Sequence, residues 1–154
     1  YRVKLPKIRG FKFKGRDEIV KAAGDSAACG FYDLKKSEIW VEKYAPRVYM
    51  MSVIIHELTH SWQKQHLDME RCSLELLEGH ATYVELEILH ALAEDSYARN
   101  TLEKLPYINN AEDNPYYQGY LLLKNEMKQY PNKNIFQVVK LLEESVIQSV
   151  SADE

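Results

Sequence analysis

Two histidines, His56 and His60, stand four residues apart in the chain, and a glutamate, Glu57, directly follows the first. On an α-helix, residues four apart lie on the same face, so both imidazoles can bind one metal ion from adjacent turns. Neutral imidazole suits Zn²⁺, and a site with three protein ligands leaves a fourth position for water. Glu57 lies beside the histidines, where its carboxylate can take a proton from that water. The spacing therefore predicts a catalytic zinc site.

The surrounding sequence predicts the helix that this spacing needs. Apolar residues recur with a helical period, and Pro46 suits the first turn of a helix. The alternative is a coincidental match on an amphipathic helix, since the five-residue pattern also occurs by chance. The context favours the metal site, because the motif falls inside a helix that periodicity predicts independently. The apolar stripe consists of Val48, Met51, Ile54, Ile55, Leu58 and Trp62.

A third ligand must come from another part of the chain, and two residues compete for this role. His66 occupies the last position of an extended three-histidine pattern, but Gln63 replaces the glycine that lets the helix end before that histidine. Glu78 lies eighteen residues beyond His60 on the next predicted helix, which a short connection allows to pack antiparallel. We therefore predict Glu78 as the ligand, with Glu75 as the fallback and His66 as a surface residue near a helix end.

The elements that must position these side chains follow a simple order along the chain. The first fourteen residues predict an irregular strand pair at a sheet edge, residues 17–28 a short helix, and residues 31–43 a β-hairpin. After the motif helix, three more helices are predicted at about residues 72–98, 115–129 and 134–150. No repeat or linker divides the 154 residues. We expect one α+β domain spanning residues 1–154.

Composition excludes several classes of partner. The net charge is −3, from 20 basic and 23 acidic residues that are interspersed, so neither nucleic acid nor anionic lipid is an expected partner. No apolar run has the length of a membrane span. Two cysteines, Cys29 and Cys72, are too few for a disulfide framework and are predicted to be buried thiols, which favours a reducing, cytoplasmic compartment. A chain that begins at Tyr1 is consistent with a domain of a larger protein.

Three stretches of the chain resemble the gluzincin zinc metallopeptidases, in particular the zinc aminopeptidases and their small single-domain relatives. Residues 56–60, HELTH, look like the zinc helix of that family, and residues 78–85, EGHATYVE, are similar to its glutamate helix. Residues 115–120, PYYQGY, contain a Tyr-x-x-Gly segment, in which the family's tyrosine steadies the oxyanion. The matching residue is Tyr116, although Tyr117 and Tyr120 are near enough to take the same role.

The resemblance implies a zincin-like fold, with a small twisted sheet, a zinc helix, a glutamate helix and a helical C-terminal part. It also implies peptide-bond hydrolysis, with one zinc ion bound by His56, His60 and Glu78, and with Glu57 and Tyr116 as catalytic residues. The aminopeptidases' Gly-x-Met-x-Asn segment has no counterpart around residues 27–32, so we expect an endopeptidase acting on peptide or protein substrates. Similarity to LIM-associated peptidases again suggests part of a larger protein. The alternative is a zincin-fold binding or regulatory domain that keeps zinc but is inactive or latent alone.

Overall fold

The computed structural model describes residues 8–24, 30–33, 35–92 and 114–152. Its sheet has three strands, β1 (Gly10–Lys14), β2 (Gly30–Asp33) and β3 (Glu38–Glu42), in the order β1-β3-β2. Strands β2 and β3 pair antiparallel, which confirms the predicted hairpin. Strand β1 pairs with β3 in parallel, with Gly10 opposite Glu38. The central strand is therefore β3, and β2 and β1 form the two edges of the described sheet.

The prediction of a strand pair within the first fourteen residues is wrong for the part of that segment that the structure describes. Residues 8–14 contain one strand, β1, and its hydrogen-bonding partner is β3, more than twenty residues later. Parallel pairing needs a crossover connection, and the helix α1 (Arg16–Ala23) lies in that connection. Within the predicted helical segment 17–28, α1 ends at Ala23, because Gly24 adopts a left-handed conformation, with φ 73°, that terminates the helix; this agrees with the prediction of a short helix.

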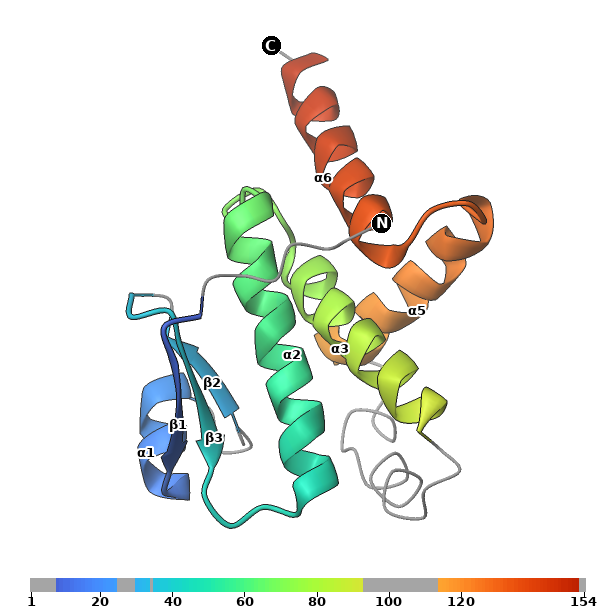
Figure 1. Ribbon diagram of the computed structural model, residues 1–154. Helices are drawn as coiled ribbons and strands as arrows, with labels where there is room; N and C mark the ends of the chain where they lie inside the picture. Colours follow the sequence, from blue (N-terminus) through green and yellow to red (C-terminus); the bar gives the residue numbers. More distant parts are fainter. Residues whose placement is uncertain (1–7, 25–29, 34, 93–113, 153–154) are drawn as a thin grey trace.

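Helices cover the sheet on both sides (Figure 1). Helix α1 packs on one side through Ile19, which is fully buried. The long helix α2 (Arg47–His66) packs on the other side, against a cluster formed by Tyr32, Ile39 and Val41 of the hairpin. Residues of α2 between Met50 and Leu58 pack against this cluster, together with Ile8. The sheet thus fixes α2, the helix that contains both histidines of the motif.

Helix α2 separates the sheet from a helical layer (Figure 1). This layer consists of α3 (Leu74–Ala91), α5 (Pro115–Gln129) and α6 (Ile135–Ala152). The second core cluster joins α2 to all three of these helices and consists of Trp62, Leu67, Leu76, Leu123, Ile135 and Val139. The predicted bounds of α5 agree with the structure, and the part of the predicted helix 72–98 beyond residue 92 lies outside the described residues. The α+β class is confirmed.

Side-chain caps set the starts of α3 and α5. The Ser73 hydroxyl accepts a hydrogen bond from the backbone N–H of Leu76, one turn into α3. The Asn114 side chain accepts one from the backbone N–H of Tyr116, and Pro115 occupies the first position of α5. Both are standard ways of satisfying the free N–H groups at a helix start. They fix the helix phase of Glu78 and of Tyr116 respectively.

Helices α3 and α5 touch at two glycines. A Cβ atom on Gly119 would lie 1.8 Å from the carbonyl oxygen of Glu75 and 2.7 Å from the Cα of Gly79. A Cβ atom on Gly79 would lie 2.3 Å from the carbonyl carbon of Gly119. The backbones therefore meet without intervening side chains, and only glycine permits this separation. The contact brings the start of α5 close to α2 and α3.

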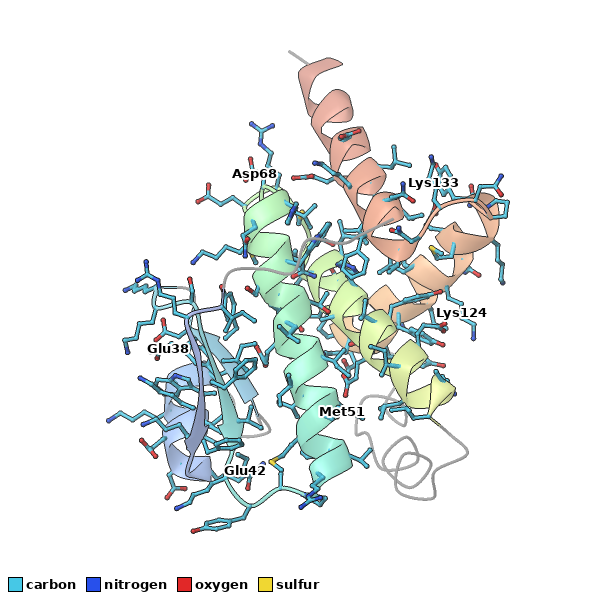
Figure 2. The ribbon with its side chains drawn as sticks, viewed as in Figure 1. Glu38, Glu42, Met51, Asp68, Lys124 and Lys133 are labelled. Atoms are coloured by element: carbon cyan, nitrogen blue, oxygen red, sulfur yellow. The ribbon has the colours of Figure 1, made fainter. Side chains whose placement is uncertain are left out.

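The segment just after the C-terminal end of α2 is hydrogen-bonded to α6. The carboxylate of Glu143, which is buried, accepts a hydrogen bond from the backbone N–H of Asp68, just beyond α2. Figure 2 labels Asp68 at this end of α2 and Met51 near the opposite end, and the histidine motif lies between them.

None of the helices in the described ranges combines the length and the apolar content needed to cross a bilayer. Cys72 is a free, partly buried thiol, and Cys29 lies outside the described residues.

Candidate metal centre

The structure brings His56 and His60 of α2 together with Glu78 of α3. Oε2 of Glu78 lies 3.2 Å from Nε2 of His56 and 3.3 Å from Nε2 of His60. One ligand atom from each residue lies within 4.8 Å of the others, so the group could hold a metal ion. The three side chains are 12%, 16% and 17% exposed. This exposure shows that the cluster is recessed but still reached by solvent.

The donor atoms suit zinc in type and spacing. Two nitrogen ligands and one oxygen ligand form a set that Zn²⁺ commonly takes, at about 2.0–2.2 Å from each donor. In a tetrahedral site with those bond lengths, neighbouring donors stand about 3.3 Å apart. The separations from Glu78 to the two histidines agree with this value. The described residues therefore fit a zinc ion with three protein ligands.

Each histidine also has a partner for its second ring nitrogen. Nδ1 of His56 lies 3.2 Å from Oε2 of Glu85, whose side chain is only 3% exposed. Nδ1 of His60 lies 2.8 Å from Oε1 of Gln63, which is fully buried. Partners of this kind orient metal-binding imidazoles and fix which nitrogen is free for the metal. Here they leave both Nε2 atoms facing Glu78.

Glu85 and Gln63 were missed as partners from the sequence. Glu85 was named only as part of the motif shared with the family. It lies seven residues after Glu78, two helical turns later on the same face. Gln63 was considered only because it replaces the glycine of the three-histidine pattern, although it lies one helical turn after His60. The usable signal was helical spacing: Glu85 follows Glu78 by two turns on α3, and Gln63 follows His60 by one turn on α2.

Glu57 lies between α2 and the edge strand β2. A Cβ atom on Gly30 would lie 3.2 Å from Oε1 of Glu57, 3.3 Å from its Cγ, and 2.2 Å from Cγ1 of Val53. Glycine at position 30 therefore lets β2 approach the Glu57 side chain. Burial raises the pKa of Glu57, while the neighbouring His60 and His56 act in the opposite direction. A raised pKa suits a carboxylate that must both accept and return a proton.

The charges of the cluster reinforce one another. Burial acts to lower the pKa of His56, but hydrogen bonds to Glu78 and Glu85 outweigh it and raise that pKa to about 10. Burial likewise acts to raise the pKa of Glu78, and its hydrogen bonds to His56 and His60 reverse the effect and lower it to about 2. The two carboxylates thus favour positive charge between them, and a bound cation would satisfy the same preference.

Tyr116 also lies at the cluster. Its ring centroid is 5.9 Å from that of His56, with the two planes inclined by 31°. Tyr120, one turn later, instead packs against Tyr83 of α3, with the ring centroids 5.9 Å apart. Within the described residues no ring contact joins Tyr117 to His56. Of the three tyrosines considered from the sequence, the structure therefore brings Tyr116 to the histidines.

The two competing ligands lie elsewhere. The ring of His66 stacks on Trp62, with centroids 4.6 Å apart and planes at 9°, and its Nδ1 is 2.9 Å from the carbonyl oxygen of Trp62. Glu75, one turn before Glu78, is exposed. Neither belongs to the metal-capable group found in the described part of the chain. Helix α2 continues to His66 without the sharp end that would turn this ring back toward His56.

Comparisons of the chain with protein-family models, with curated proteins and with solved structures found no match in any of the three. The interpretation of the site therefore depends on its own geometry and on its sequence motifs.

Proposed function

We propose that the chain is a zinc-dependent peptidase of the gluzincin type, with a zincin-like fold, and that it acts as an endopeptidase on peptide or protein substrates. The main observation behind the proposal is that His56, His60 and Glu78 meet in one group, with Glu78 at tetrahedral donor spacing from each histidine and Glu57 next to His56 in the chain. In this proposal these three residues hold one zinc ion. When bound there, zinc supplies a Lewis acid that polarises a carbonyl and acidifies water.

Glu57 carries the proton transfers in this mechanism. Its carboxylate accepts a proton from the water that attacks the peptide carbonyl, and it later gives that proton to the departing amine. The raised pKa of Glu57 supports this role, because a group with a pKa nearer neutrality both gains and loses a proton more readily. Tyr116 is the proposed donor to the carbonyl oxygen as negative charge develops on it. Its ring contact with His56 places it at the same cluster.

The substrate surface proposed is the edge strand β2. Two stretches of the hairpin, residues 30–32 and 39–41, are candidates for an edge that binds a peptide strand. Strand β3 has a neighbour on each side, whereas β2 is paired only with β3 among the described strands. Strand β2 also approaches Glu57 at Gly30. A substrate that adds to β2 as a further strand would pass beside the metal centre.

The test pairs metal analysis with cleavage of a peptide library by the whole chain. Wild type should bind about one zinc per chain and produce internal cleavages. Glu57→Gln should keep its zinc and lose cleavage. The matched control is Glu75→Gln, which changes an exposed glutamate outside the cluster and should leave both properties unchanged. The proposal fails if wild type binds no zinc, or if Glu57→Gln cleaves as fast as wild type.

A further inference from the structure

Gln63 makes three polar contacts through one fully buried amide group. Its Nε2 lies 2.7 Å from the carbonyl oxygen of Leu77 in α3 and 3.2 Å from Nδ1 of His80. Its Oε1 lies 2.8 Å from Nδ1 of His60. The amide thus stands between the second histidine of the motif and the backbone of the helix that contains Glu78.

These contacts determine which way the amide points. A backbone carbonyl oxygen is only an acceptor, so the atom beside Leu77 O must be the NH₂ group of Gln63. The second N–H of that group is available to Nδ1 of His80, which is buried in the same place. The opposite orientation would set two acceptor oxygens 2.7 Å apart in a buried site, which is strongly unfavourable. Oε1 therefore faces His60.

The orientation of Gln63 in turn determines the tautomer of His60. Because Oε1 is only an acceptor, Nδ1 of His60 must carry the hydrogen. The neutral ring then has its lone pair on Nε2, the atom that lies 3.3 Å from Oε2 of Glu78. We propose that Gln63 is a positioning residue, held by the backbone of α3 and by His80, which keeps His60 in the Nδ1–H tautomer so that Nε2 can bind metal.

The proposed role of Gln63 depends on the proposed function, because it concerns a ligand of the same metal site. Gln63 links the two helices that carry the ligands, since it belongs to α2 and its amide is bound to Leu77, the residue directly before Glu78. One side chain therefore couples the orientation of His60 to the placement of Glu78. Removal of partners in this position typically weakens metal binding about 10- to 100-fold.

The first test needs no substitution. In ¹⁵N-labelled wild type, heteronuclear NMR distinguishes the two neutral tautomers of His60 by the shifts of the ring nitrogens. We expect a hydrogen on Nδ1 of His60, protected from exchange, in both the metal-free and the zinc-loaded chain. A metal-free His60 without a hydrogen on Nδ1, or a zinc-loaded His60 that binds the metal through Nδ1, would overturn the inference. If wild type binds no zinc, the proposed function fails, whereas the tautomer still reports on the Gln63 contact.

The second test measures zinc affinity by competition with a chelator. Gln63→Leu, which has no acceptor for His60, should bind zinc about 10- to 100-fold more weakly than wild type. The control is Gln65→Leu, at an exposed position two residues along the same helix, and it should bind like wild type. Wild-type affinity in Gln63→Leu would refute the role, and if that variant does not fold, the tautomer measurement decides.

Discussion

The close contact between α3 and α5 predicts how Gly119→Ala changes the free energy of unfolding. In an open helix, alanine stabilises a protein by about 1 kcal/mol relative to glycine. Here the added Cβ would lie 1.8 Å from the carbonyl oxygen of Glu75, and the obstructing atom is backbone that cannot rotate away. The helices must separate by about 1.5 Å to restore an ordinary contact, and overpacking of this kind costs about 1–3 kcal/mol or more. We therefore expect a net loss of stability where propensity alone predicts a gain.

The assay is urea unfolding of the whole chain followed by circular dichroism. Gly119→Ala should lower the free energy of unfolding by about 1–2 kcal/mol, while Gly10→Ala, where an added Cβ meets nothing within 4 Å, should change it little. Tyr116 lies one turn before Gly119, so the displaced helix should also shift this ring relative to His56. A misplacement of about 1 Å can reduce turnover about 100-fold. A Gly119→Ala protein at least as stable as wild type would refute the close packing.

Three further outcomes follow from the site and the core. Glu78→Gln replaces a carboxylate ligand by a neutral amide and should weaken zinc binding by more than about 100-fold in chelator competition; affinity within tenfold of wild type would exclude Glu78 as a ligand. Gly30→Ala should displace the Glu57 side chain, so peptide cleavage should fall while zinc content stays at the wild-type level; simultaneous loss of zinc would contradict this explanation. Leu123→Ala empties a fully buried position and should cost about 2–5 kcal/mol in urea unfolding, against little change for exposed Leu122→Ala.

The local elements were predictable wherever short-range signals decide them. Pro115 opens α5, and Pro131 separates it from the next helix, so the predicted end near Gln129 agrees with the structure. The hairpin follows from two β-rich stretches with a turn between them. The parallel pairing of β1 with β3 was not predictable, because no local signal specifies a partner more than twenty residues away.

The same division applies to the candidate site. The spacing of His56 and His60 on one helix is local, and it alone predicts two donors on one face. The choice of Glu78 over His66 depended on Gln63, and the structure places Glu78 with the histidines. The contact of Gln63 with His60 could not be predicted from the sequence, because the Leu77 carbonyl of a second helix orients the amide. The closeness of Tyr116 to His56 likewise depends on the glycine contact between α3 and α5.

In the proposed site, two histidines of α2 and one glutamate of α3 hold a single zinc ion. Crystals of the zinc-loaded chain, measured at energies on either side of the zinc absorption edge, locate the metal directly. We expect one anomalous peak at about 2.0–2.2 Å from Nε2 of His56, Nε2 of His60 and a carboxylate oxygen of Glu78. A zinc peak bound by other residues, or no peak at these three side chains in zinc-soaked crystals, would contradict it.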